Sequence, residues 1–297
     1  MRLLACLFVV VGILAWDSAA ESIPRGDIIP HHSMEPPFVH DWWEEGVPHW
    51  DVGGDAVATN EMIRLTPQRA SRFGWAWNSQ RNDNPWWEVK MQFYIRSRQN
   101  PGADGLAFWY AQEPYKGREP GPLFGMPADF KGIGVLFDSY DNDHQRDNPA
   151  TMVISNVRGE TNQWNLDSDL IDQSAFRCLF DHRNTADGDP VEMVLQYYQR
   201  RLTLRMRTVL RSSSEAFCGE ISDIELPMDW TFGATATTGA LSDNHDIISI
   251  EVRPLGDPIG DPSIPQQEGR LPQPRQFDHE ADSKEKDYWR PKDAPAE

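Results

Sequence analysis

The sequence has few of the features that mark enzymes or zinc proteins. It contains only three cysteines among 297 residues, and no two of them have C-x-x-C spacing. The eight histidines are scattered without metal-ligand spacing, which argues against a zinc site. No G-x-S-x-G motif, P-loop or dinucleotide-binding fingerprint is present. The usual sequence signals of zinc, serine-hydrolase and nucleotide chemistry are therefore missing.

Long apolar runs are confined to the N-terminus. There Arg2 precedes the apolar stretch 3–16 and the small residues Ser18-Ala19-Ala20. This order predicts a secretory signal peptide over residues 1–20. An uncleaved membrane anchor is the alternative, but the run is shorter than the roughly 20 apolar residues that a span needs. Since no later stretch could cross a bilayer, we expect a mature chain that is soluble, in the secretory pathway or outside the cell.

An excess of positive charge is also absent. The 28 basic and 46 acidic side chains leave a net charge of −18, which argues against binding to nucleic acid or to anionic membranes. The same balance is compatible with calcium, which prefers hard oxygen ligands. Cys6 leaves with the predicted signal peptide, and an oxidising compartment then predicts a disulfide between Cys178 and Cys218. A reactive thiol pair is the alternative.

Long amphipathic helices and internal repeats are missing, and alternation of apolar and polar residues dominates instead. It occurs over 87–96, over 201–207 and near 248–253, where Ile248, Ile250 and Val252 are expected on one face. The apolar runs GLAFWYA, GIGVLF, TMVIS and VEMVLQYY suit inner strands. We therefore predict an all-β fold, a two-sheet antiparallel β-sandwich, over residues 21–256. Residues 257–297, rich in proline and charge, are predicted to be a disordered tail.

A strongly acidic stretch, FDSYDNDHQRDNPA, follows the apolar run GIGVLF directly. It contains Asp138, Asp141, Asp143 and Asp147. Carboxylates, amides and backbone carbonyls are the ligands that calcium requires. The stretch is not an EF-hand, because Gln145 and Arg146 replace the fifth ligand and the glycine turn. A calcium loop and a solvated acidic loop both remain open on composition alone.

Two other stretches contain acidic residues in positions that could support binding or catalysis. Asp104, in GADGLAFWY, precedes an apolar strand and would accept hydrogen bonds at a sheet rim, although it equally suits a turn. In EISDIELP, Asp223 and Glu225 share a strand face, whereas Glu220 points the other way. A retaining glycosidase needs two carboxyl groups about 5 Å apart across its substrate. The pattern therefore misses that of jelly-roll glycoside hydrolases.

Several of these stretches, in this order, resemble the L-type lectins of the secretory pathway. The resemblance covers about residues 32–255 and rests on VPHWDVGGDAV, GADGLAFWYA, GPLFG, FDSYDNDHQRDNPA, TGALSDNHDIIS and the spacing of the two later cysteines. That family includes the mannose-binding cargo receptors of the ER–Golgi intermediate compartment and their vesicular relatives. It implies a legume-lectin-like antiparallel β-sandwich of jelly-roll type, Ca²⁺ as cofactor and no enzymatic activity. It also implies high-mannose glycoproteins as partners in ER–Golgi sorting, and leaves a homo-oligomer open.

The resemblance also implies particular site residues. The family's metal ligands fall on Asp138, the carbonyl of Tyr140, Asn142 and Asp169. Its sugar contacts fall on Asp104, Asn142, Gly239, Ala240 and Leu241.

Two positions depart from the family pattern. Leu166 stands where the family has a sugar-contacting histidine, and Trp75 where it has a sugar-contacting serine. Trp75 would either stack on a sugar or block the groove. A mannose-binding lectin is therefore the leading hypothesis, and a lectin-fold protein-interaction module with weakened or lost sugar binding is the alternative.

Overall fold

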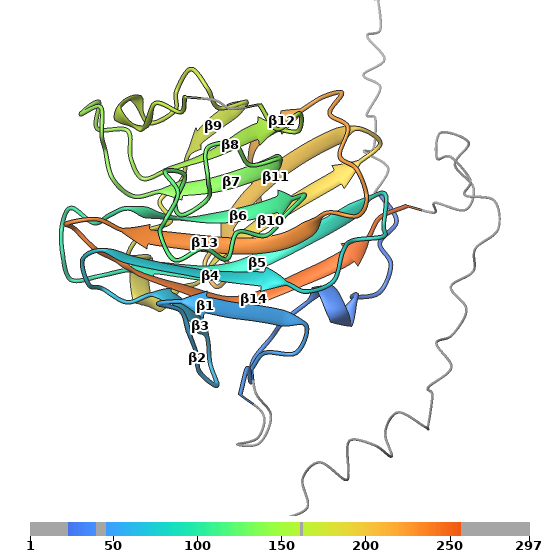
Figure 1. The fold of residues 1–297 in the computed structure, drawn as a ribbon, viewed down its shortest axis with the longest axis horizontal. Helices are drawn as coiled ribbons and strands as arrows, with labels where there is room; N and C mark the ends of the chain where they lie inside the picture. The colour runs from blue at the N-terminus through green and yellow to red at the C-terminus, as the bar shows by residue number, and fades with distance from the viewer. Residues whose placement is uncertain (1–22, 40–45, 161–162, 257–297) are drawn as a thin grey trace, which may run out of the picture. The chain divides into compact units, whose positions relative to one another are not determined.

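Two seven-stranded antiparallel sheets form the fold in this computed structural model (Figure 1), which describes residues 23–39, 46–160 and 163–256. The first sheet runs in the order β1 (Trp50–Gly54), β4 (Arg72–Asn78), β13 (Thr231–Thr238), β6 (Gly105–Ala111), β7 (Gly132–Asp138), β8 (Ala150–Asn156) and β9 (Phe176–Leu179). The second runs in the order β12 (Ala216–Ile221), β11 (Arg201–Thr208), β10 (Val191–Tyr198), β5 (Trp87–Arg96), β14 (Asn244–Pro254), β3 (Ile63–Thr66) and β2 (Val57–Ala58). Short 3-10 turns lie at η1 (Pro30–His32), η2 (Leu166–Ser168) and η3 (Ala186–Gly188).

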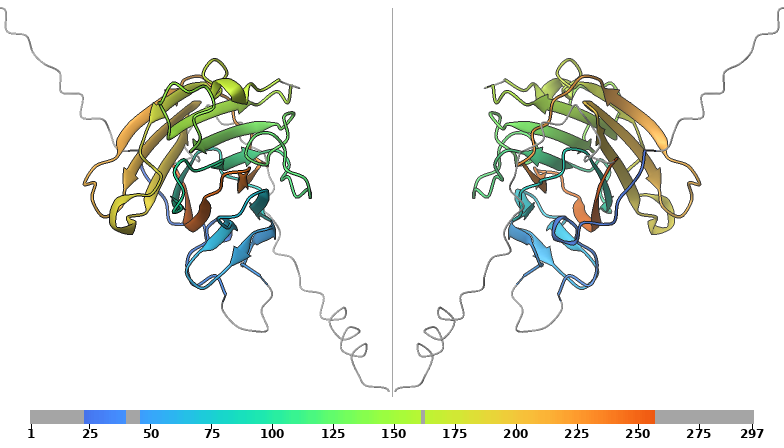
Figure 2. Two further views of the ribbon diagram at one scale, coloured as in Figure 1. Left: turned by 90° about the vertical axis from the view of Figure 1, so that its left-hand side faces the viewer. Right: turned by 90° about the vertical axis from the view of Figure 1, so that its right-hand side faces the viewer.

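The two sheets stack face to face, and the side views show them as two layers (Figure 2). Aromatic side chains fill the space between them: the Phe93 ring lies 4.5 Å from the Phe137 ring, and the Trp87 ring 5.3 Å from that of Phe232. Because successive side chains of a strand point to opposite faces, alternating strands place one apolar row in this core. The predicted all-β sandwich is confirmed.

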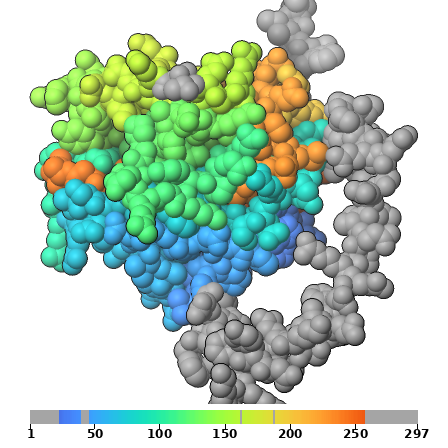
Figure 3. Space-filling view, viewed as in Figure 1, coloured from blue at the N-terminus to red at the C-terminus, as the bar shows by residue number. Residues whose placement is uncertain are grey.

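The apolar runs became inner strands, as predicted. Every residue of β6 and of β7 is buried, and each of these strands pairs with a neighbour on both edges. Their outer faces are buried because the loops that follow β6 and β8 cover them, with Leu123, Phe130 and Leu170 packed on the strands. The space-filling view shows the green loop region lying over this face (Figure 3). The loops that follow β6 and β8 are thus packed against the sheet.

The alternation in β14 is predicted only in part. Ile250 and Val252 are fully buried, but Ile247 is buried in place of Ile248. A register shift between Ile247 and Ser249 in the pairing with β5 leaves Ile248 unpaired. The expectation that Ile248 shares the inward face is therefore wrong, because a bulge resets the period of two.

The predicted disulfide is present. Cys178 on β9 is bonded to Cys218 on β12, so the bridge joins the outermost strands of the two sheets. Among the described residues, no helix is long and apolar enough to span a membrane. The signal peptide over 1–20 and the tail over 257–297 lie outside the described residues and stay predictions.

Candidate functional site

Asp138 is the last residue of the buried strand β7, paired on its two sides with Gly105 of β6 and Ala150 of β8. Because strands lie on both sides of it, the residue is only 5% exposed. Its Oδ1 accepts a hydrogen bond from the Tyr140 N–H at 3.1 Å. Burial, with a smaller contribution from the charge of Asp169, raises the pKa of Asp138 well above its ordinary value. A carboxylate in this position is stabilised by a nearby cation.

Asp169 reaches the same loop from a distant part of the chain. It caps η2 with a left-handed backbone, φ 47°, and is 1% exposed. Its Oδ1 accepts the Asn142 N–H at 3.2 Å, whereas its buried Oδ2 has no partner in the described part of the chain. Burial raises the pKa of Asp169. The hydrogen bond to Asn142 thus holds the segment around η2 against the loop after β7.

Three further carboxylates gather around Asp169. Oxygen atoms of Asp141, Asp143, Asp147 and Asp169 lie within 4.8 Å of one another. Asp141 and Asp147 each bury an oxygen that has no hydrogen-bond partner among the described residues. The Arg177 guanidinium donates to Asp147 at 2.6 Å and lowers the pKa of that carboxyl. One arginine leaves most of the negative charge of this cluster uncompensated.

This donor set suits calcium. The clustered side chains offer oxygen alone, and calcium takes six to eight oxygen ligands. The buried oxygens without partners show that the protein itself does not satisfy the cluster. The carbonyl of Tyr140 also faces the loop interior, where it accepts a hydrogen bond from the Asn148 side chain. The sequence placed Asp141, Asp143 and Asp147 in a candidate calcium loop, but the resemblance assigned none of them as a ligand. Their D-x-D-x-x-x-D spacing after a buried strand was a usable signal.

A pocket of about 420 Å³ opens beside the acidic loop. Three parts of the chain line it: the start of β6 with Asp104, the acidic loop with Asn142, and the loop after β13 with Ala240 and Leu241. Gly239 belongs to the same place, since a Cβ atom built on it would lie 3.0 Å from Asp104 Oδ1. The structure therefore brings together all five residues that the resemblance assigned to sugar contact.

Asp104 is held in this pocket by backbone contacts on both sides. Its N–H donates to Thr237 O at 3.2 Å, and its carbonyl accepts the Ser139 N–H at 3.1 Å. Burial, together with the nearby charge of Asp243, raises the pKa of Asp104 to about 6. Asp104 is thus ionised at neutral pH and able to accept two hydrogen bonds from a ligand.

The two positions that depart from the family pattern lie in different places. Leu166 lines the pocket with Asp104 and Asn142, so an apolar side chain stands in the wall of this site. Trp75 does not line that pocket; it lines an adjoining cleft between β4 and the loop after β6. Trp75 therefore does not block the pocket around Asp104.

The acidic residues considered for glycoside hydrolysis do not form a site. Asp223 and Glu225 are exposed, and the same residue, Arg200, pairs with them at 2.8 and 3.2 Å. Neither residue lines the pocket around Asp104 or the cleft around Trp75. A pair of carboxyl groups flanking a substrate cleft is not found here.

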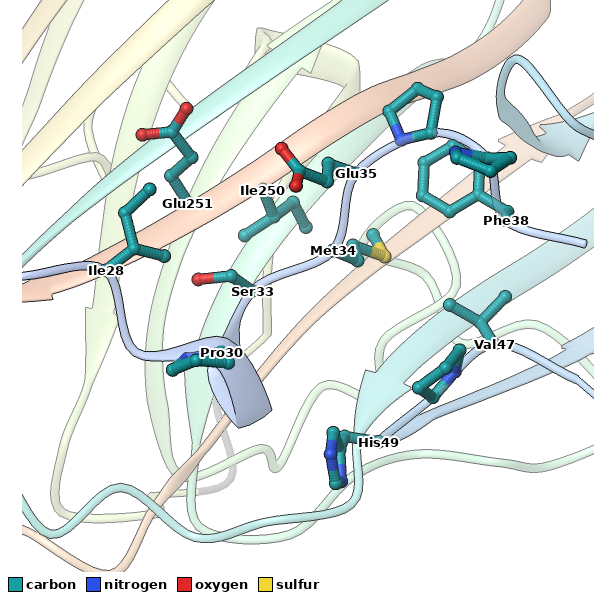
Figure 4. Close-up of a pocket in the computed structure, with 13 residues that line it drawn as sticks. Ile28, Pro30, Ser33, Met34, Glu35, Phe38, Val47, His49, Ile250 and Glu251 are labelled. Carbon is teal, nitrogen blue, oxygen red and sulfur yellow. The ribbon is translucent and has the colours of Figure 1, made fainter. Parts of the chain in front are cut away.

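A pocket of about 470 Å³ lies elsewhere, between the N-terminal segment and β14 (Figure 4). Its walls are mainly apolar, with Met34, Phe38, Val47 and Ile250 turned toward it. Its two carboxylates, Glu35 and Glu251, do not belong to the acidic cluster. Its chemistry does not resemble that of the pocket around Asp104.

Comparison with known proteins supplies independent findings. The chain matches the model of the Legume-like lectin family over residues 27–259. Protein ERGIC-53 of Rattus norvegicus is 33% identical over 224 residues, which are 75% of this chain and 42% of that protein. Vesicular integral-membrane protein VIP36 of Mus musculus is 32% identical over 224 residues, 74% of this chain and 60% of that protein. The chain thus spans less than half the length of the ERGIC-53 relatives that it matches.

Solved structures agree with the sequence matches. The exoplasmic/lumenal domain of VIP36 in its Ca²⁺/Man3GlcNAc-bound form aligns with a TM-score of 0.68 at 30% identity, over 76% of this chain and 90% of that one. Its metal-free form aligns with a TM-score of 0.69, over 78% and 95%. Those structures have the same fold as the sandwich described above, and one of them holds both a calcium ion and a mannose-containing sugar.

Proposed function

Because the chain belongs to the legume-like lectin family, we propose that it is a calcium-dependent lectin that binds mannose-type glycans. One observation carries this proposal: a single pocket is lined by Asp104, by Asn142 of the acidic loop and by Ala240 and Leu241 of the loop after β13. Asp138, the buried end of β7, lines the same pocket. Metal ligands and sugar contacts are therefore neighbours.

The metal would be held by Asp138, the Tyr140 carbonyl, Asn142 and Asp169. Their side chains and carbonyl supply only oxygen, and Asp169 already contacts the Asn142 backbone. Bound calcium supplies the positive charge that these carboxylates lack. The cluster of Asp141, Asp143 and Asp147 would add further oxygen ligands or attract the ion through its charge.

The sugar would be recognised by complementary donors and acceptors. Ionised Asp104 accepts hydrogen bonds from two hydroxyl groups, the Asn142 amide both donates and accepts, and the N–H groups of 239–241 donate. Asn142 serves both sites, so its orientation couples them. Calcium binding should therefore precede and strengthen sugar binding.

We place this activity in the lumen of the early secretory pathway, in the sorting or transport of glycoproteins between ER and Golgi. The support is the predicted signal peptide, the disulfide between Cys178 and Cys218, and the similarity to ERGIC-53 and VIP36. The partners would be glycoproteins that carry N-linked high-mannose glycans. We propose a binding protein without enzymatic activity, since the candidate carboxylates Asp223 and Glu225 point into solvent and pair with Arg200.

One observation favours a second function, a protein-interaction module that keeps the fold but binds sugar weakly. Leu166 lines the pocket where the resemblance implies a histidine, and it can make no hydrogen bond to a hydroxyl. Loss of one hydrogen bond costs about 0.5–1.5 kcal/mol, which weakens binding by about 2- to 13-fold. That loss alone reduces affinity without abolishing it.

Calcium titration followed by mannose titration, both by calorimetry, tests the proposal. We expect calcium to bind first and mannose to bind only to the calcium-loaded protein. Asp138→Ala should abolish both responses. A glycan array with and without chelator separates the two functions: a calcium-dependent mannose signal supports the lectin, and the absence of any such signal supports the interaction module.

A further inference from the structure

The cleft that contains Trp75 adjoins the pocket around Asp104. It has a volume of about 610 Å³ and lies between β1, the start of β4 and the loop 116–120. Successive residues at the end of β13 divide the two cavities, since Thr237 lines the pocket and Thr238 lines the cleft. The Ser71 N–H on the cleft side donates to Gly239 O at 2.9 Å on the pocket side. The two cavities therefore share one rim.

The orientation of Trp75 presents carbon surface to this cleft. Trp75 lies opposite Gly53 in the β1–β4 ladder, and a Cβ atom on Gly53 would lie 2.3 Å from Trp75 Cζ2. The ring thus lies down over the backbone of β1, in space that only a glycine leaves free. The indole Nε1 is buried. Because the nitrogen is inaccessible, the exposed part of this half-buried side chain is aromatic carbon.

Polar side chains surround this aromatic surface. Arg72, Lys116, Arg118 and Glu119 line the cleft together with Asp55. Asp55 is engaged with Arg72 and with the Phe73 N–H, and Lys116 pairs with Asp51 at 2.6 Å. Within the described part of the chain, Arg118 has no hydrogen-bond or ion-pair partner, and the Glu119 carboxylate has none either. An apolar platform flanked by free donors and acceptors matches a sugar ring, which has a C–H face and a hydroxyl edge.

We propose that this cleft is a second carbohydrate subsite, which binds a further neutral hexose of the glycan whose mannose occupies the pocket at Asp104. The hexose stacks on Trp75, and Arg118 and Glu119 bond its hydroxyl groups. The inference rests on the proposed function, because the first sugar must occupy the pocket for the glycan to cross the rim at Ser71 and Gly239. Trp75, which stands where the resemblance implies a serine, then supplies a contact for longer glycans.

The test compares mannose with an α-linked mannotriose on the full chain in saturating calcium, by calorimetry. We expect the wild-type protein to bind the trisaccharide about tenfold more tightly than mannose. Trp75→Ser should remove about that tenfold advantage and leave the mannose Kd unchanged. The matched control is Phe217→Ser, an exposed aromatic on β12 of the other sheet, 61% accessible, which should alter neither Kd.

Arg118→Ala provides a second variant that does not disturb the packing of β4, because Arg118 is exposed. It should weaken trisaccharide binding by about threefold, the effect of one hydrogen bond, without changing mannose binding. Equal losses for mannose and trisaccharide in Trp75→Ser, or no loss for either sugar in both variants, would overturn the subsite while leaving the lectin proposal intact. If the wild-type protein binds neither sugar in calcium, the proposed function fails and the subsite fails with it.

Discussion

Arg183 and Asp243 form a two-pronged ion pair beside Ala103, a residue that lines the pocket. Arg183 Nε and Nη2 donate to the two Asp243 carboxylate oxygens at 2.8 and 2.9 Å, and Asp243 is fully buried. The Asp243 N–H donates to Ala103 O at 2.9 Å, so the pair joins the loop of 239–243 to the residue before Asp104. Arg183 also donates to Gln99 O at 2.6 Å. These bonds hold two walls of the pocket in register.

Arg183→Leu should therefore destabilise the fold strongly. Removing the arginine leaves Asp243 charged and buried without a partner, which costs about 3–5 kcal/mol of unfolding free energy. Urea unfolding measures this difference. Arg200→Leu is the control, since Arg200 pairs with exposed acids, and it should leave the urea midpoint unchanged. Equal midpoints for the two variants would contradict a structural role for the buried pair.

Asp169→Asn should remove calcium binding while keeping the fold. The change deletes one charge and keeps the shape of the side chain, including an acceptor for the Asn142 N–H. In the wild type, calcium at about 100 times its Kd should add about 2.7 kcal/mol of stability, seen as a higher melting temperature. Asp167→Asn, an exposed acid on η2 in the same segment, should keep the full calcium response. A calcium-dependent shift that survives in Asp169→Asn would show that the ion binds elsewhere.

Mannose affinity should fall as the pH drops through about 6. The pKa of Asp104 is raised from 3.8 to about 6 by burial and by Asp243, so the carboxylate is ionised above that pH and protonated below it. Since only the ionised form accepts two hydroxyl hydrogen bonds, each pH unit below the pKa should weaken binding by up to about tenfold. Calorimetry in saturating calcium between neutral and acidic pH measures the profile. Asp104→Asn should bind more weakly with a flat profile in the same range, and an equal slope in that variant would assign the titration to another group.

Leu166→His should strengthen mannose binding. Leu166 lines the pocket, and a histidine there places a donor or acceptor where the wall is now apolar. One added hydrogen bond predicts a Kd about 2- to 13-fold lower. Leu166→Ala, which opens the same wall without adding a polar group, is the control and should not gain affinity. A gain in both variants would point to steric relief at this wall instead of hydrogen bonding.

Much of the fold could be predicted because its signals are local. Alternation with a period of two gives a strand its inward face, and wholly apolar runs such as the one in β6 reflect burial on both sides. The bulge at Ile248 has no such signal, since the pairing of β14 with β5 decides it. The pairing of Cys178 with Cys218 followed from having just two cysteines after the signal peptide.

The site residues could be predicted only because several sequence motifs occur in the same order as in a known family. Asp104, Asn142 and the loop at 239–241 come from distant stretches, and no local pattern shows that they meet; the family resemblance supplied that link. The place of the Trp75 ring could not be predicted from sequence alignment alone. The ring packs on the backbone of β1, which is possible because Gly53 has no side chain. Arg183 and Asp243 were missed because an ion pair between residues 60 apart in the chain leaves no sequence spacing to read.

The disulfide between β9 and β12 has a consequence for the compartment in which the protein can fold. Each of these strands is the last of its sheet, so each has one edge that is not hydrogen-bonded to another described strand. Unpaired edge strands can form a sheet with other chains. Leu179 and Phe217, next to the two cysteines, add exposed apolar surface at these edges. If the protein folded where thiols stay reduced, no disulfide would hold β9 and β12 together, and the two edge strands could separate. In the oxidising lumen that we propose for this protein, the disulfide would therefore hold the two edge strands together and limit self-association there.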